Sequence, residues 1–97
     1  MNNVFDRRYA SNFLEQMDLS GKDVLDVGFG DGWLIDAKWR QVHAMTALES
    51  NADHVAAAEA RWAGTPIAEK VVFLHADIAK TVLPAHLYDA VIFAHSF

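Results

Sequence analysis

The chain has 97 residues, of which 53% are hydrophobic and 22% charged, and 13 acidic against 8 basic residues give it a formal net charge of -5. This length and composition indicate one small folded domain, and the absence of cysteine excludes disulfides and thiolate metal sites and favours a reducing cytoplasm as the location. No apolar run is long enough to span a bilayer, and the basic residues are too scattered to form the positive surface that nucleic-acid binding requires.

An amphipathic helix is predicted near the N-terminus, within residues 1–20. Tyr9, Phe13 and Met17 recur at intervals of four residues, which places them on one face of a helix. We expect this apolar stripe to pack against the rest of the domain.

The most informative segment follows, at residues 24–32, where the sequence reads VLDVGFGDG. A short apolar run with Asp26 inside it is typical of a buried strand, and Gly28, Gly30 and Gly32 at alternate positions are typical of a tight turn. Glycine allows positive φ and lets a ligand approach the backbone closely, because it has no Cβ. The segment therefore predicts a strand that leads into a ligand-binding turn.

Three further strands are predicted where short apolar runs recur, at Ala44–Leu48, Val71–His75 and Ala90–Phe93. Between them the sequence predicts a helix from Asp31 or Gly32 to about Gln41, a helix from a capping box at Ser50 and Asp53 to about Trp62, and only a short or broken helix over residues 79–87. Strands that alternate with helices imply a parallel sheet with right-handed crossovers.

An acid closes the second strand, since Glu49 follows the apolar run 17 residues after Gly32. A glycine turn after one strand and an acid after the next usually hold a nucleoside cofactor. Asp31 in the turn would repel a pyrophosphate, and Trp33 occupies the place of the third glycine of the dinucleotide fingerprint. These residues favour a positively charged cofactor without phosphate, and a nicotinamide dinucleotide is the alternative.

Four segments in this order are similar to the motifs of one family: VLDVGFGDG at 24–32, ALES at 47–50, FLHADI at 73–78 and YDAVIFAHSF at 88–97. They resemble the class I S-adenosylmethionine-dependent methyltransferases, in their N-terminal, cofactor-binding half. The resemblance implies a Rossmann-like three-layer α/β sandwich with parallel strand order 3-2-1-4. The family's sheet has seven strands, so we expect residues 1–97 to be a single domain truncated after its fourth strand, with an N-terminal helix in 1–20 and the β/α half in 21–97.

The resemblance also implies that S-adenosylmethionine is the cofactor and assigns its binding to Asp26, Gly28, Phe29, Gly30, Gly32, Glu49, Ser50, Asp77, Ile78 and His95. Asp26 would hold the methionine ammonium, and its alternative role is to order the glycine turn by accepting backbone N–H bonds. Gly32 is expected to serve helix–strand packing.

Three further positions have both a binding role and a structural alternative. Glu49 would accept from both ribose hydroxyls, or it is an acid at the start of a helix. Ser50 would lie beside the adenine, or it is only a helix cap. Asp77 would accept from the adenine amino group, with the Ile78 amide facing a ring nitrogen, or it is a turn or N-cap aspartate.

The methyl acceptor is expected to be a small molecule. DNA-base methylases of the family carry Asp/Asn-Pro-Pro-Tyr/Phe after the fourth strand, whereas this chain has Ala-His-Ser-Phe at 94–97. His95 is a candidate general base near the reacting methyl, and it could instead only line the pocket. No metal-ligand spacing is found among the histidines.

Three other readings stay open from the sequence. They are a nicotinamide-binding oxidoreductase domain, an aminopropyltransferase-like domain, and a non-enzymatic domain that dimerises through an exposed sheet edge. The fourth strand is apolar on both faces, so we expect self-association along it, opposed by a charge at Ile92. We expect the isolated chain to have no methyltransferase turnover.

Overall fold

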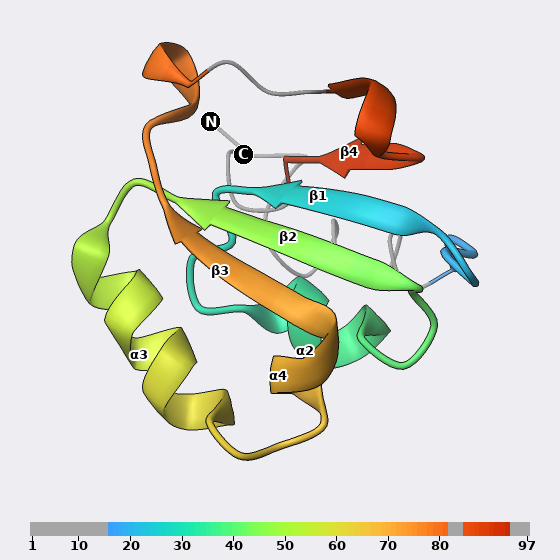
Figure 1. Ribbon diagram of the computed structural model, residues 1–97, viewed down its shortest axis with the longest axis horizontal. Coiled ribbons are helices and arrows are strands. Elements are labelled where there is room, and N and C mark those ends of the chain that lie inside the picture. Colours follow the sequence, from blue (N-terminus) through green and yellow to red (C-terminus); the bar gives the residue numbers. More distant parts are fainter. Residues whose placement is uncertain (1–15, 82–84, 94–97) are drawn as a thin grey trace, which may run out of the picture.

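The computed structural model describes residues 16–81 and 85–93. The predicted N-terminal helix with Tyr9 and Phe13, and the candidate base His95, lie outside these residues. The described elements are, in chain order (Figure 1), β1 Asp23–Val27, α2 Trp33–Lys38, β2 Ala44–Glu49, α3 Ala52–Trp62, α4 Ile67–Lys70, β3 Val71–His75, the 3-10 turn η1 Ile78–Lys80, the 3-10 turn η2 Ala85–Leu87, and β4 Ala90–Ile92.

The four strands form one parallel sheet in the order β3-β2-β1-β4, which confirms the predicted Rossmann-like topology (Figure 1). In its register Val27 lies opposite Leu48, and Glu49 lies opposite His75. The carboxyl ends of β1, β2 and β3 therefore meet at one edge of the sheet, and the order of strands reverses between β1 and β4. Ligands of open α/β sheets bind outside the carboxyl ends of the strands at such a point.

All three α-helices of the described residues pack on one face of the sheet. Their buried apolar side chains form the main core with one side of every strand, made by Leu19, Val24, Phe29, Leu34, Ile35, Val42, Met45, Ala47, Val55, Ala58, Trp62, Ile67, Val71 and Ile92. The opposite face has a smaller cluster of Leu25, Val27 and Leu48 with Ala76 and Tyr88. No α-helix of the described ranges contributes to the cluster on this second face. None of the described helices is long and apolar enough to cross a membrane.

Helix α2 is shorter than predicted, because it ends at Lys38 and not near Gln41. The next carbonyls are held by a side chain from another element: Lys70 Nζ donates to the carbonyls of Trp39 at 3.4 Å, Arg40 at 3.2 Å and Val42 at 2.9 Å. These long-range contacts satisfy groups that would otherwise bond within a longer helix.

The sequence does not predict helix α4, because Pro66 by itself indicates only the end of the preceding helix. In the structure Pro66 is the N-cap of α4, with φ -59° and ψ -23°. Proline is compatible with the start of a helix, since its fixed φ is helical and its missing N–H has no partner there in any case.

The N-cap of α3 is Asn51, so the predicted capping role of Ser50 is wrong. The Asn51 side chain accepts from the backbone N–H of Asp53 at 2.9 Å and of His54 at 3.4 Å. Asn51 has an extended backbone, with φ -88° and ψ 112°, which is the usual conformation of an N-cap residue.

Replacing Asn51 by Ala is expected to cost about 1 kcal/mol of unfolding free energy, because two amides at the start of α3 lose their acceptor. Urea unfolding followed by far-UV circular dichroism measures this cost. Ser50→Ala is the matched control and should lie close to the unmodified chain. Equal losses in the two variants would contradict the assignment of the cap.

Candidate functional site

The glycine turn after β1 is held in a conformation that requires glycine. Gly28, Gly30 and Gly32 have φ values of 71°, 59° and 84°, in the left-handed region that other residues rarely adopt. The N–H of Gly28 donates to the carbonyl of Leu48 at 2.7 Å, which fastens the turn to the end of β2. The turn therefore lies across the carboxyl ends of β1 and β2, as the sequence predicts.

Gly32 packs against a helix and not against a strand, which corrects the expectation for this residue. A Cβ on Gly32 would lie 2.5 Å from Cη2 of Trp62, a buried residue of α3. Trp62 in turn stacks on Phe73 of β3, with 5.8 Å between ring centroids. The close approach between the turn and α3 is therefore possible only with glycine at position 32.

Phe29 contributes its side chain to the core. Its ring is buried and meets Phe73 edge to face, with 5.7 Å between centroids. Only the backbone of Phe29 is thus left to line a ligand site.

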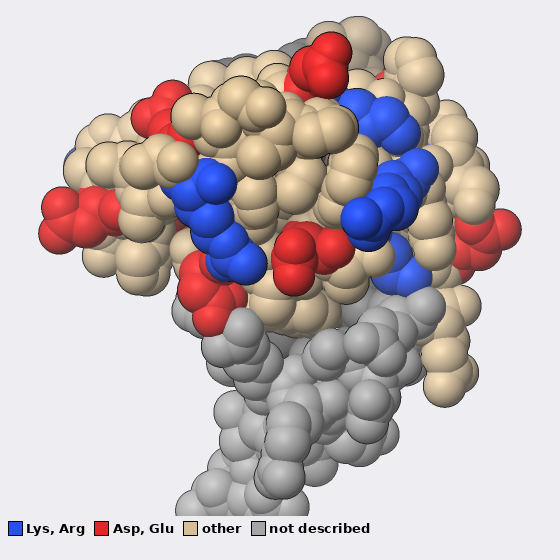
Figure 2. All heavy atoms as spheres, turned by 90° about the horizontal axis from the view of Figure 1, so that it is seen from below, with Lys and Arg blue, Asp and Glu red and all other residues tan. Residues whose placement is uncertain are grey.

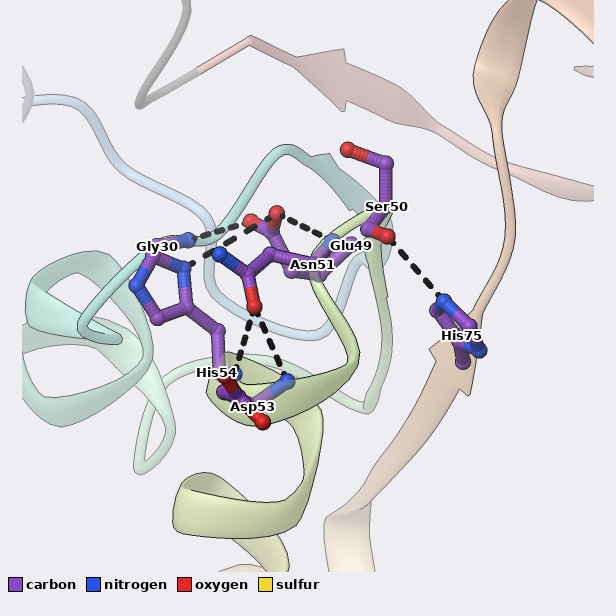
Figure 3. Close-up of polar contacts among 7 residues, drawn as sticks. All are labelled: Gly30, Glu49, Ser50, Asn51, Asp53, His54 and His75. Atoms are coloured by element: carbon purple, nitrogen blue, oxygen red, sulfur yellow. Dashed lines mark hydrogen bonds and ion pairs between the residues drawn. The ribbon is translucent and has the colours of Figure 1, made fainter.

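Glu49 joins the glycine turn to the start of α3 (Figure 3). Its carboxylate accepts from the N–H of Gly30 at 2.8 Å through Oε1 and from the N–H of Asn51 at 2.9 Å through Oε2. The role of ordering the turn, considered above as an alternative for Asp26, therefore belongs to Glu49. The contact with Asn51 also agrees with the alternative of an acid at the start of a helix.

His54 completes this cluster and is not among the site residues predicted from the sequence. Its Nδ1 lies 3.9 Å from Glu49 Oε2 (Figure 3) and is buried without a hydrogen bond to any described residue. The signal in the sequence was its place in the first turn of α3, three residues after the N-cap Asn51. A second buried polar group outside the predicted site residues is the indole N–H of Trp33, which lacks an acceptor within the described ranges.

Asp26 is the most unusual group of the site. Its side chain is buried, with 0% exposure of the residue, and neither carboxyl oxygen has a hydrogen-bond partner among residues 16–81 and 85–93. Burial, followed by the charge of neighbouring Glu49, raises the pKa of Asp26 to about 7. An unpaired buried carboxylate is costly, and a carboxyl in this state at the end of a strand is a candidate for binding a charged ligand group.

The remaining predicted residues lie along the same edge of the sheet. Ser50 is exposed, and its carbonyl accepts from Nε2 of His75 at 3.0 Å (Figure 3). Asp77 follows β3 and is the N-cap of η1, where Oδ1 accepts from the N–H of Ala79 at 2.9 Å. This confirms its structural alternative, and its binding role and that of exposed Ile78 stay predictions. The structure thus brings Asp26, the glycine turn, Glu49 and Ser50 together, with Asp77 and Ile78 beyond the next strand.

Known proteins share both the sequence and the fold. The profile of a family described as a methyltransferase domain matches residues 24–97. An uncharacterized methyltransferase from Mycobacterium tuberculosis is 41% identical over 69 residues, which are 71% of this chain and 33% of the relative. The chain therefore spans about a third of the length of the curated relatives that it matches.

Solved structures agree with this fold. An S-adenosylmethionine-dependent methyltransferase from Mesorhizobium loti has a TM-score of 0.69 at 21% identity and is matched over 88% of this chain and 37% of its own. The glycopeptide N-methyltransferase MtfA complexed with sinefungin has a TM-score of 0.68 at 22% identity, over 96% of this chain and 37% of its own.

The matched residues begin at β1 and include the glycine turn, Glu49 and β4. They therefore contain the whole of the candidate site described above. The chain belongs to the methyltransferase domain family and has the Rossmann-like fold of the class I S-adenosylmethionine-dependent methyltransferases.

Proposed function

We propose that this domain binds S-adenosylmethionine at the glycine turn and is the cofactor-binding part of a methyltransferase that acts on a small molecule. The observation that carries the proposal is the buried Asp26 carboxyl with no partner for either oxygen among the described residues. Because the chain spans about a third of its relatives' length, the activity and acceptor of the whole protein are part of the proposal.

The residues present fit this cofactor. Asp26 would accept from the ammonium of the methionine part, which supplies the missing partner. Glu49 accepts one amide at each oxygen and retains a lone pair on each for the ribose hydroxyls. The backbone of Gly28, Phe29 and Gly30 lies between these two carboxylates in the sequence.

Other residues take less direct roles. Ser50, Asp77 and Ile78 would lie beside the adenine, Gly32 holds the turn against α3, and His95 stays a candidate near the reacting methyl. When bound, S-adenosylmethionine supplies a methyl group on a sulfonium that is already activated for transfer.

The charge of the site also separates this proposal from a dinucleotide-binding domain. Asp26 and Glu49 are both buried acids, and exposed Asp31 lies in the turn between them and α2. A pyrophosphate would face these acids, whereas a cofactor with an ammonium and no phosphate would be attracted. Membership of the methyltransferase family likewise favours this reading over the nicotinamide-dependent and aminopropyltransferase alternatives.

Basic side chains of the described residues support a small acceptor over nucleic acid. Arg40 lies over the Trp39 ring and Arg61 over the Trp62 ring, at 4.6 and 4.7 Å from the centroids, while Lys70 holds backbone carbonyls. Figure 2 shows acidic side chains between the Lys and Arg side chains of one face. On this face the basic side chains are thus interspersed with acidic ones, whereas nucleic-acid binding needs several cations that face phosphates together.

The test of the proposal is ligand binding by the whole 97-residue chain. S-adenosylhomocysteine should bind and raise the midpoint of thermal unfolding, and NAD at the same concentration should not. Glu49→Ala should weaken S-adenosylhomocysteine binding by about 1–3 kcal/mol in calorimetry, because ribose hydroxyls and two backbone amides lose their acceptor. Glu49→Gln keeps one acceptor oxygen, so its affinity for S-adenosylhomocysteine should lie between those of the unmodified chain and Glu49→Ala.

Glu69→Ala is the matched control, since Glu69 is an exposed acid of α4 away from the glycine turn. It should bind like the unmodified chain. Unchanged affinity in Glu49→Ala would remove Glu49 from the site, and stabilisation by NAD alone would contradict the proposed cofactor.

We also propose that a second copy of this chain pairs with it along the edge of β4. In this strand Val91 is 39% exposed, on the face that no described α-helix covers, whereas Ile92 is 8% exposed and belongs to the main core. A charge at Ile92 would therefore disturb the core as well as the strand edge, and Val91 is the better position for a charge that tests association alone. Val91 and exposed Phe93 are the apolar side chains that a second copy would meet.

We expect the unmodified chain to form associated species in sedimentation velocity and the Val91→Lys variant to be more monomeric, because a charge on an edge strand opposes pairing. Ile92→Lys serves as the contrast, since a lysine in the core should lower the unfolding free energy by several kcal/mol. A compact monomer at high concentration of the unmodified chain would contradict this expectation.

A further inference from the structure

The carboxyl group of Asp26 is placed where an ionised form has nothing to pair with. Asp26 lies on β1, an interior strand of the sheet, and its register neighbours on the two adjoining strands are Ala47 and Ile92, which have no polar side-chain atoms. Both of its oxygens are buried, and neither accepts a hydrogen bond from a described residue. A group in this environment lowers its free energy by taking up a proton.

The other titratable groups of the cluster increase this tendency or act elsewhere. Glu49 on β2 adds a second negative charge near Asp26 and is itself fixed by two amides. His54 on α3 faces Glu49 Oε2 at 3.9 Å. Lys38 is buried in α2, and its Nζ donates to the carbonyl of Met17 at 2.8 Å. Within the described ranges only Glu49 acts on the Asp26 charge, and it acts against ionisation.

We propose that Asp26 carries a proton in the free domain and releases it when the ammonium of the cofactor binds beside it. This inference rests on the proposed function, because the cation is the ammonium of S-adenosylmethionine or S-adenosylhomocysteine. In the exchange the O–H bond of the Asp26 carboxylic acid breaks, the proton passes to the buffer, and the carboxylate accepts hydrogen bonds from the ammonium. The site thereby selects a cationic ligand, because a neutral group offers nothing to replace the proton.

The coupling makes ligand affinity depend on pH in a defined direction. Burial and Glu49 raise the pKa of Asp26 to about 7 in the free chain, so the ligand has to displace a proton at low pH and none at high pH. S-adenosylhomocysteine should bind about tenfold more tightly at pH 8 than at pH 6. At pH 7 its binding should release about half a proton per site.

The experiment is calorimetric titration of the whole chain with S-adenosylhomocysteine in two buffers of different ionisation enthalpy, at pH 6, 7 and 8. The difference in observed heat between the buffers gives the number of protons released. Asp26→Asn should lose this release at every pH, whereas His54→Gln should keep it. A release that persists in Asp26→Asn and disappears in His54→Gln would overturn the proposal, because the proton would then come from His54.

The outcomes separate this inference from the proposed function. Binding without proton release refutes the inference and leaves the cofactor site standing, whereas absence of binding refutes the proposed function. A carbon-13 NMR titration of the Asp26 carboxyl in the free chain tests the inference independently of any ligand. A carboxyl that is fully ionised at pH 6 would overturn it.

Discussion

Replacement of Asp26 by Asn is expected to stabilise the free domain at pH 8 by about 4 kcal/mol, although it removes a residue that we assign to ligand binding. The pKa of Asp26 rises from 3.8 to about 7 on folding, because of burial and the nearby Glu49. A shift of roughly three units at about 1.4 kcal/mol per unit gives this magnitude. Asn keeps the shape of the side chain and never has to be ionised in the buried site.

Because the pKa of Asp26 is higher in the folded chain than in the unfolded chain, its effect on the unfolding free energy depends on pH in one direction. Below pH 3.8 the carboxyl is protonated in both states and costs nothing. Between pH 3.8 and about 7 the unfolded chain loses this proton while the folded chain keeps it, so the unfolding free energy falls as pH rises. Above about pH 7 the folded chain is ionised too, and the loss stays constant. The Asn variant should therefore match the unmodified chain near pH 4 and exceed it increasingly up to pH 7.

Urea unfolding of both proteins at pH 4 to 8 measures this difference. Asp36→Asn is the reference for removing one exposed carboxylate, since Asp36 lies on the exposed side of α2. Parallel pH profiles for Asp26→Asn and the unmodified chain, or a less stable Asn variant at pH 8, would contradict the expectation. The predicted gain means that the free domain gives up stability in order to hold an acid in its ligand site.

Replacement of Gly32 by Ala is expected to destabilise the domain by about 2–5 kcal/mol. A side chain at φ 84° costs about 1–2 kcal/mol by itself. A Cβ at 2.5 Å from Trp62 Cη2 adds an overpacking cost of about 1–3 kcal/mol, because the indole is buried and stacked on Phe73. The turn and α3 would have to move apart, so cofactor affinity should fall as well.

Gly64→Ala is the matched control for this variant. Gly64 has φ 74°, and a Cβ there would meet nothing within 4 Å, so its replacement measures the backbone cost alone. The unfolding free energies from urea titration should differ between the two variants by the overpacking cost. In a Trp62→Leu background Gly32→Ala should cost less, which a double-mutant cycle detects. Equal losses at positions 32 and 64, or no coupling to position 62, would contradict the steric explanation.

The sequence by itself determined the strands, the glycine turn and their order along the chain, whereas the order 3-2-1-4 within the sheet was implied by the resemblance to the methyltransferase family. Each rests on short-range patterns: an apolar run ended by glycines, an acid after the second strand, and helical segments between strands that require parallel pairing. The positive φ of Gly28, Gly30 and Gly32 could be expected because alternate glycines have little other use in a tight turn.

Only the tertiary structure decided which of these residues orders the turn and which packs against a helix, because each role depends on contacts between distant positions. Glu49 rather than Asp26 orders the turn, through a bond to an amide 19 residues away. Gly32 meets Trp62, 30 positions later, which no local pattern reveals.

The unsatisfied state of Asp26 is likewise a property of the folded chain, since it depends on which polar groups the fold brings near its two oxygens. In β4 the run of apolar residues has no alternation, so only packing against α-helices on one face shows that Ile92 points inward and Val91 outward. Periodicity along the chain thus decides which elements form, whereas the side-chain environment decides which residues bind, pack or hold the turn.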